Sequence, residues 1–401
     1  MKAGWEIKTL GEVCHFVRGP FGGSLKKSMF VESGIAVYEQ QHAIYNQFDD
    51  IRYFVDDAKF EEMKRFELQP NDLIMSCSGT MGKVAIVPDN IQKGIINQAL
   101  LKLTPSKSIS SNFLSYWMTS PNFQNSLNEQ SGGAAIQNVA SVSILKEIKI
   151  KLPPLPEQKR LVTLLDEAFE SIATAKANAQ QNLKNARALF ESHLNEVFTK
   201  RGEGWEEKTL GELGTITSSK RIFKSEYVDS GIPFFRTKEI KELANGQEIS
   251  TELFISEERY KEIKTNFGVP KQGDILLTAI GTIGEIYVVK GENDFYFKDG
   301  NVLWLKEFNT INPNFLKYVL ISFVESLNKM AHGSTYSALP IQRLNVHTVF
   351  VPSLHEQNEI VNQLDSLREE TKRLEALYSR KISALDELKK ALLHRAFAGE
   401  L

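Results

Sequence analysis

The chain contains one unit twice, and this repeat limits its possible folds more than any other feature. Gly4–Val13 returns as Gly204–Leu213, at an offset of 200 residues. Four further pairs follow in the same order: Val31–Ile35 with Val228–Ile232, Asp72–Gly82 with Asp274–Gly284, Phe113–Tyr116 with Phe315–Tyr318, and Glu157–Gln158 with Glu356–Gln357. Because the offset drifts, the copies differ by loop insertions and deletions. The 401 residues are therefore two units of about 200.

Each unit begins with about 150 residues of short β-like runs separated by turn residues. Leu73–Ser76 with Val84–Val87 is predicted to form a hairpin, and Ile275–Thr278 with Ile286–Val289 repeats it. Helices are predicted at two matching positions, Phe113–Thr119 and Phe315–Ser322. The pattern predicts an α+β fold with two β-rich domains in tandem, residues 1–154 and 201–352, each followed by a long helix, residues 155–200 and 353–401.

The two long helices carry an apolar stripe. Prolines in Leu152–Pro156 exclude helix before Glu157. A helix over Glu157–Phe198 would be about 63 Å long, and its stripe needs a partner, for which the other copy is the obvious candidate. A period of about 3.6 residues predicts a nearly straight pair. The predicted pairing residues are Leu161, Leu165, Ile172, Leu183, Phe190, Ile360, Leu364, Leu367, Leu374, Ile382 and Leu385.

These features together resemble the specificity (S) subunit of type I restriction–modification enzymes. The resemblance is carried by the Pro-Pro-Leu-Pro-Glu-Gln start of the first helix, by the repeated Gly-Trp-Glu opening, and by the ending Ala396–Leu401. Val351–Gln357 departs from the pattern, because it holds one proline where the first copy has three. The resemblance covers nearly the whole chain.

The resemblance implies two target recognition domains, each of which reads one half of a bipartite, asymmetric site in double-stranded DNA. It implies that the long helices pair as an antiparallel coiled coil with pseudo-twofold symmetry, set the spacer between half-sites, and dock two methyltransferase (M) subunits. Motor-endonuclease (R) subunits would join for cleavage. The chain itself would bind no cofactor, because the M subunit supplies S-adenosylmethionine chemistry and the R subunit uses ATP and Mg²⁺.

The residues agree with a non-catalytic chain. The sequence contains no Asp/Asn-Pro-Pro-aromatic motif and no phosphate-binding Gly-x-x-x-x-Gly-Lys-Ser/Thr loop. Its seven histidines show no metal-ligand spacing, so neither catalytic nor metal residues are predicted. Two cysteines, no signal peptide and no apolar run of membrane-spanning length predict a cytoplasmic protein. Two alternatives remain: an S-type subunit of a methyltransferase-only or fused nuclease–methyltransferase system, and a structural coiled-coil dimerisation protein.

Local charge indicates where DNA would bind. The net charge of −2 excludes a uniformly basic DNA coat but allows local patches. Two matching stretches, Val13–Val31 and Leu213–Ser225, contain no acidic residue. Gly/Ser loops with long cations suit phosphate contacts, although a surface loop without a ligand would have the same composition. The candidates for phosphate contact are Arg18, Lys26, Lys27, Lys220, Arg221 and Lys224.

Base reading requires amide, guanidinium or similar side chains at a groove edge. After a shared Ser-Gly-Ile, the copies diverge at Tyr38–His42 and Phe235–Glu239, as two different half-sites would require. Fold-supporting polar residues would look the same. The base-reading candidates are Gln40, Gln41, His42, Arg236, Thr237 and Lys238, with a second set formed by Gln137, Asn138, Ser334, Thr335 and Tyr336.

Overall fold

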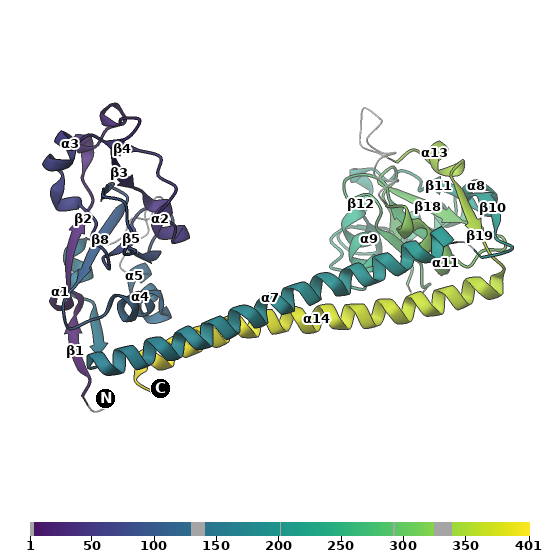
Figure 1. Cartoon of the computed structure of the whole chain (residues 1–401). Helices are drawn as coiled ribbons and strands as arrows, with labels where there is room; N and C mark the ends of the chain where they lie inside the picture. The colour runs from purple at the N-terminus through teal and green to yellow at the C-terminus, as the bar shows by residue number, and fades with distance from the viewer. Residues whose placement is uncertain (1–3, 130–140, 201, 292, 325–338) are drawn as a thin grey trace. The chain divides into compact units, whose positions relative to one another are not determined.

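The computed structural model describes residues 4–129, 141–200, 202–291, 293–324 and 339–401 (Figure 1). The chain divides into two compact units, Met1–Gln180 with Ser379–Leu401 and Gln181–Tyr378. Each unit contains one β-rich domain and parts of both long helices. The predicted α+β architecture with an internal repeat is therefore confirmed.

The sheets of the first unit are built from nine strands among its described residues. A four-stranded antiparallel sheet has the order β2-β8-β5-β6, a three-stranded sheet the order β4-β3-β7, and β1 pairs with β9. The strands are β1 (Glu6–Thr9), β2 (Cys14–Arg18), β3 (Ile35–Tyr38), β4 (Phe54–Val55), β5 (Leu73–Ser76), β6 (Val84–Ile86), β7 (Gly94–Ile96), β8 (Leu100–Pro105) and β9 (Lys149–Leu152).

The second unit repeats this topology with one added strand, β12, at the edge of the sheet that corresponds to β4-β3-β7. Its sheets have the orders β11-β18-β15-β16, β12-β14-β13-β17 and β10-β19. The strands are β10 (Glu206–Thr209), β11 (Thr215–Ser218), β12 (Tyr227–Val228), β13 (Ile232–Phe235), β14 (Phe254–Ile255), β15 (Ile275–Thr278), β16 (Ile286–Val288), β17 (Tyr296–Phe297), β18 (Val302–Lys306) and β19 (Thr348–Val351). Both predicted hairpins, β5–β6 and β15–β16, are confirmed.

Short helices cover the sheets, and the two predicted ones correspond to α4 and α11. The first unit has α1 (Leu10–Val13), α2 (Gln40–Tyr45), α3 (Asp57–Glu62), α4 (Ser111–Thr119), α5 (Pro121–Glu129) and α6 (Val142–Lys146), with 3₁₀ turns η1 (Gly22–Ser24), η2 (Lys27–Met29) and η3 (Lys64–Phe66). The second unit has α8 (Leu210–Leu213), η4 (Lys224–Glu226), α9 (Thr237–Ala244), α10 (Glu257–Asn266), α11 (Pro313–Ser322) and α13 (Ile341–Asn345). The long helices are α7 (Leu155–Lys200) and α14 (Leu354–Ala398).

The repeated opening segment forms a short strand that closes each domain onto its long helix. β1 pairs with β9, the strand that runs into α7, and β10 pairs in the same register with β19, which runs into α14. Glu12 and Glu212 then bond back to the backbone N–H of Thr9 and Thr209, each at 2.6 Å. These capping bonds fix the turn into α1 and α8. The repeated Gly-Trp-Glu-x-Lys-Thr-Leu-Gly-Glu pattern therefore has a structural role, because it closes each domain onto its long helix.

The apolar stripes of the long helices are covered, as predicted. Among the predicted pairing residues, Leu161, Leu165, Ile172, Phe190, Ile360 and Leu364 are buried, and the other five are partly buried. In the first unit, Arg160 donates to the Leu401 carbonyl at 2.9 Å and Lys176 pairs with Asp386 at 2.6 Å, so the helices run antiparallel. In the second unit, Arg187 pairs with Glu375 at 3.0 Å.

The start of the first helix differs from the prediction. We expected Glu157 to begin it, but α7 begins at Leu155 and includes Pro156 in its first turn. A proline is tolerated there because the first N–H groups of a helix have no acceptor within the helix. The second helix begins at the corresponding place, Leu354.

A buried glutamine at the start of each long helix holds the neighbouring domain. Gln158 is fully buried; its amide oxygen accepts from the Ser110 N–H at 2.9 Å, and its amide nitrogen donates to the Ser108 and Pro153 carbonyls at 2.8 and 2.9 Å. Gln357 is equally buried and makes the same three bonds, to Asn312, Thr310 and Pro352. We call this arrangement the glutamine latch.

A tyrosine one step further along reinforces each latch. Tyr116 of α4 hydrogen-bonds Asp166 of α7, and Tyr318 of α11 hydrogen-bonds Asp365 of α14. Burial is the largest cause that raises the pKa of both phenols, and the carboxylate partner raises it further. Both tyrosines therefore remain protonated donors at neutral pH. Each helix–domain junction is therefore fixed at two points.

Replacing Gln158 with Ala is expected to lower the free energy of unfolding of the first unit by about 3 kcal/mol, because buried backbone groups lose their partners. The measurement is urea unfolding of the full chain followed by circular dichroism. The matched control is Gln180→Ala, since Gln180 is an exposed glutamine of the same helix. Equal effects of the two substitutions would contradict the latch.

Candidate nucleic-acid interface

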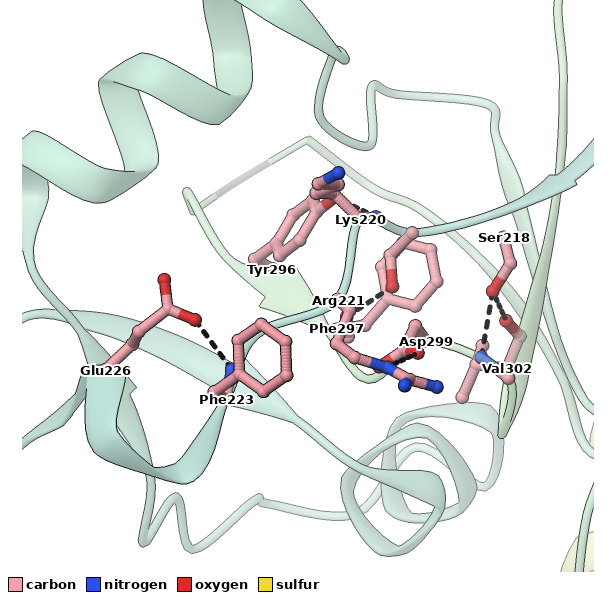
Figure 2. A network of polar contacts seen from close by, with 11 residues as sticks. Ser218, Lys220, Arg221, Phe223, Glu226, Tyr296, Phe297, Asp299 and Val302 are labelled. Atoms are coloured by element: carbon pink, nitrogen blue, oxygen red, sulfur yellow. Dashed lines mark hydrogen bonds and ion pairs between the residues drawn. The ribbon is translucent and has the colours of Figure 1, made fainter.

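The predicted phosphate-contact loop of the second unit follows β11 and is held by polar bonds to the strands beside it (Figure 2). Ser219 donates from Oγ to the Phe297 carbonyl at 2.7 Å, and the Lys220 N–H donates to the Tyr296 hydroxyl at 2.6 Å. Ser218 Oγ donates to the Val302 carbonyl at 3.3 Å and accepts from the Gly300 N–H at 3.0 Å. Hydroxyl and main-chain groups therefore fix the loop.

The cations of this loop remain at the surface. Lys220, Arg221 and Lys224 are exposed, and Arg221 forms an ion pair with Asp299 at 2.9 Å. Lys220 lies over the Phe267 ring, with its ammonium 4.8 Å from the ring centroid. A fixed backbone with surface ammonium and guanidinium groups is suited to bind phosphate oxygens.

The corresponding loop of the first unit depends on close backbone packing. A Cβ atom at Gly19 would lie 1.9 Å from the Asn97 carbonyl oxygen, so only glycine fits there. Lys26 and Lys27 are exposed, as phosphate contact requires. Arg18 is only partly exposed and its Nη1 atom is buried. The inward side of Arg18 lies near the buried Cys77 thiol. Burial raises the pKa of this thiol to about 11, and the positive charge of Arg18 opposes the rise. Arg18 therefore presents less of its guanidinium than we expected.

The first base-reading segment forms the start of α2. Ser78 donates from Oγ to the Gln40 amide oxygen at 3.2 Å, and the Gln41 amide nitrogen donates to the Asp50 carbonyl at 3.1 Å. Both glutamines are partly exposed. His42 contradicts the prediction, because only 1% of it is exposed. The Glu39 N–H donates to the Nδ1 atom of His42 at 2.8 Å, and the Nε2 atom of His42 lies 3.1 Å from the Asp50 carbonyl oxygen. The imidazole ring therefore supports the start of α2.

The second base-reading segment forms the start of α9 and carries an ion-pair network. The Arg236 guanidinium bonds Glu239 at 2.7 Å and Glu252 at 3.0 Å, and Lys238 lies 3.6 Å from Glu252. Arg236 is therefore already paired, whereas Lys238 is exposed. Thr237 is partly exposed but its hydroxyl oxygen is buried, so that oxygen does not face a ligand in this conformation.

The two reading segments share one structural role despite different residues. His42 and Glu239 both occupy the third helical position and accept from the backbone N–H three residues earlier, at 2.8 Å in each case. Burial raises the pKa of Glu239, but the hydrogen bonds from Arg236 outweigh it and hold the pKa below its ordinary value. These two residues are therefore fixed by the fold, and Gln40, Gln41 and Lys238 remain as accessible candidates.

Sequence reasoning predicted the β5–β6 hairpin but missed that its turn lies against the start of α2. Ser76 donates from Oγ to the Thr80 carbonyl at 2.6 Å and accepts from the Lys83 N–H at 3.0 Å, which places Ser78 against Gln40. Thr278 makes the matching bonds to Thr282 and Glu285. The repeated Gly-Thr-x-Gly was the available signal. The second candidate set, Gln137, Asn138, Ser334, Thr335 and Tyr336, lies outside the described residues.

The described residues lack two other features, a metal-binding cluster and a membrane-spanning helix. Within these ranges, no cluster of three or more His, Cys, Asp or Glu residues could hold a metal ion. None of the helices described is both long enough and apolar enough to cross a membrane.

Comparison with known proteins identifies the fold and the family. A family model for the type I restriction modification DNA specificity domain matches residues 2–185 and 202–382. The chain belongs to this family. The two matches coincide with the two copies of the repeat. The expected class is thereby confirmed: a DNA specificity subunit, which is a non-catalytic part of type I restriction–modification enzymes.

Individual relatives agree with the family assignment. A Haemophilus influenzae protein named as a type I restriction enzyme specificity subunit is 29% identical over 226 residues, which cover 55% of this chain and 56% of that protein. The chain thus spans just over half of that relative. The MjaVIII specificity subunit of Methanocaldococcus jannaschii is 24% identical over 392 residues, 90% of this chain and 86% of that protein.

A solved structure shows the same fold over the whole chain. It comes from work on complex assembly and conformational transition of a type I restriction–modification system, with a TM-score of 0.80 at 20% identity. The match covers 100% of this chain and 99% of the other.

Replacing Arg236 with Ala is expected to lower the free energy of unfolding of the second unit by about 3 kcal/mol at pH 7, because Glu239 would be buried without its partner. The pKa of Glu239 is depressed in the folded chain, so the ion pair stabilises above the ordinary carboxyl pKa and fades as pH falls through the folded value. The difference in free energy of unfolding between wild type and variant should narrow from pH 7 to pH 3, because the ion pair is lost only below the ordinary carboxyl pKa. Urea unfolding at each pH measures it.

The control for this experiment is Lys238→Ala, because Lys238 is exposed and its ion pair with Glu252 is long. It should change the free energy of unfolding by less than about 0.5 kcal/mol at either pH. A gap that is constant with pH would show that Glu239 is not the titrating group.

Proposed function

We propose that each β-rich domain of this specificity subunit reads one half of a bipartite, asymmetric site in double-stranded DNA. One observation supports the proposal: the two domains share a scaffold but expose different side chains at the starts of α2 and α9. The latches, the hairpin turns and the strand orders match in the two units, except that β12 adds one strand to the smaller sheet of the second unit. The accessible side chains at the starts of α2 and α9 differ, with Gln40 and Gln41 against Lys238.

The chemistry of the exposed groups supports this division of labour. Glutamine amides suit adenine, and a lysine ammonium suits the acceptor edge of guanine. Lys26, Lys27, Lys220 and Lys224 lie on loops where they would position the strand without selecting its sequence. In this proposal, affinity comes from the loops and selectivity from the two helix starts.

The long helices would set the distance between half-sites and dock two methyltransferase subunits. Exposed apolar side chains on α7 and α14, among them Leu189, Leu377 and Leu388, are available to a partner. S-adenosylmethionine would be bound by the methyltransferase subunits, and ATP and Mg²⁺ by motor-endonuclease subunits, in the cytoplasm. Free, buried Cys14 and Cys77 fit a reducing compartment.

Methylome sequencing of a host that expresses this chain with its methyltransferase partner tests the proposal. We expect adenine methylation at one bipartite motif, with two unrelated half-sites and a fixed spacer. Gln41→Ala should relax discrimination about tenfold at one half-site only, and Lys238→Ala at the other only. Methylation without a bipartite motif would contradict the proposal. If both variants relax the same half-site, the division between domains is wrong.

The spacer is expected to follow helix length. Inserting seven residues after Gln180 and seven after Tyr378, where the units divide, keeps the apolar stripe nearly in phase. At about 1.5 Å per residue, the preferred spacer should lengthen by about three base pairs while each half-site keeps its sequence. Insertion into α7 alone is the control and should abolish methylation, because the stripes no longer match. An unchanged spacer after the double insertion would show that helix length does not set the distance between half-sites.

A further inference from the structure

A cleft in the second unit gathers positively charged side chains. It has a volume of about 620 Å³ and is lined by residues of α9, β16, α11 and α14. Three lysines line it, and Arg368 lies one helical turn before the last of them on α14. We call these four residues the cation cluster: Lys290, Lys317, Arg368 and Lys372. The other lining residues are mainly apolar, among them Leu243, Ala244, Ile286, Val288 and Pro313.

The cation cluster has few carboxylates beside it. In the part of the chain that the structure describes, none of its four members forms an ion pair. The Lys317 ammonium lies 5.4 Å from the centroid of the Tyr318 ring, and the Arg368 guanidinium lies 5.0 Å from that of Phe190. Asp365 is the acid whose charge acts on Lys317, and it accepts a hydrogen bond from Tyr318. The cleft therefore carries net positive charge.

Holding these charges together costs stability. Burial lowers the pKa of Lys317, and the positive charges of Arg368, Lys372 and Lys290 lower it further, while Asp365 opposes them. Arg368 and Lys372 are four residues apart on one helix, where like charges repel. Cations that the fold holds against repulsion at the wall of a cleft indicate a site for an anion.

The first unit shows that the fold does not require the cation cluster. Matched hydrogen bonds of the latches, the tyrosines and the hairpin turns fix the correspondence between the two units. At the positions of the four cations, the first unit has, in the same order, Pro88, Ser115, Phe169 and Ala173. The same scaffold is therefore built without any of these charges, and the second unit holds them for another purpose.

The size of the cleft selects the kind of anion. Its volume is within the range of small-molecule sites, which is about 300–1,000 Å³. Lys290 and Lys372 are exposed, but Lys317 is partly buried. A DNA duplex would meet the exposed side chains first, whereas a small anion can enter the cleft that all three lysines line. Lysine ammonium groups bind phosphate oxygens, and the apolar wall is suited to an uncharged ring such as a nucleobase.

We infer that this cleft binds a small polyphosphate of the class that includes nucleoside triphosphates, with the cation cluster on the phosphates and the apolar wall against the base. The site goes beyond the proposed function, since it needs no DNA and only the second unit has the cluster. Its ligand would strengthen the junction of the second domain with α14, because it would join Lys290 and Lys317 of the domain to Lys372 of that helix.

Isothermal titration calorimetry of the full chain with ATP, without Mg²⁺, tests the inference. We expect one ATP per chain, and binding of inorganic phosphate on the order of tenfold weaker or less, because it engages fewer cations. Lys317→Gln and Lys372→Gln should each weaken ATP binding about tenfold, since each removes a charge-assisted contact. The matched control is Lys261→Gln, which removes the same charge from an exposed lysine of α10 outside the cleft and should leave binding unchanged.

Thermal unfolding separates loss of binding from loss of the fold. Without ligand, Lys317→Gln should unfold at the temperature of the wild type or above it, because the substitution relieves repulsion within the cluster. ATP should raise the unfolding temperature of the wild type and of Lys261→Gln, but not that of Lys317→Gln. An equal rise in all three proteins would place the bound ATP elsewhere and overturn the inference.

The remaining outcomes identify other ligands of the cluster. If ATP does not bind, the inference is wrong, and two further measurements on the complex with the methyltransferase partner show what the cations contact instead. Weaker DNA binding by Lys317→Gln would indicate a DNA phosphate, and weaker assembly would indicate acidic side chains of the methyltransferase. The sequence preference of the wild-type complex tests the proposed function separately, because it does not depend on ATP binding to this cleft.

Discussion

The glutamine latch is the contact on which the rest of each unit depends. A domain that reads DNA must be held at a fixed angle to the helix that carries it, and a hinge of free loop could not do this. Gln158 and Gln357 each satisfy three backbone groups from two segments with one buried amide. An amide is suited to the task because it is both donor and acceptor and carries no charge to desolvate. The nearby tyrosine–aspartate bonds add a second fixed point, so the junction resists rotation as well as separation.

Comparison of the two copies distinguishes residue positions that the fold requires from positions that can vary with function. Positions that agree in the two copies are those with internal partners, such as the hydroxyls of Ser76 and Thr278 or the carboxylates of Glu12 and Glu212. Positions that differ include accessible ones, such as Gln41 and Lys238, and buried His42 and Glu239 differ while they fill the same structural role. One scaffold can therefore carry two specificities, because the residues that set its geometry do not face the ligand.

The predictable features were those that depend on local pattern. The apolar stripes follow from helical period alone, and the hairpins from turn residues between β-like runs. The latch was not predicted as a contact, because a glutamine has no period and its partners lie about 48 residues away. Burial of His42 and Thr237 was missed for a different reason. Residues that suit base edges are also those that cap helix starts, and the sequence does not show that a helix begins there. Composition identified the loops, and only tertiary contacts show which cations remain exposed.

The near-neutral charge has a consequence for selectivity. Several candidate cations already have carboxylate partners, including Arg221 with Asp299, Arg236 with Glu239, and Lys238 with Glu252. A phosphate would have to compete with each partner, so these pairs add little to non-specific attraction. In the proposed function, loop cations without such a partner would contribute more to binding, and they require a close fit. If the proposed function holds, a chain of net charge −2 would leave random DNA readily and would hold DNA that matches both reading segments.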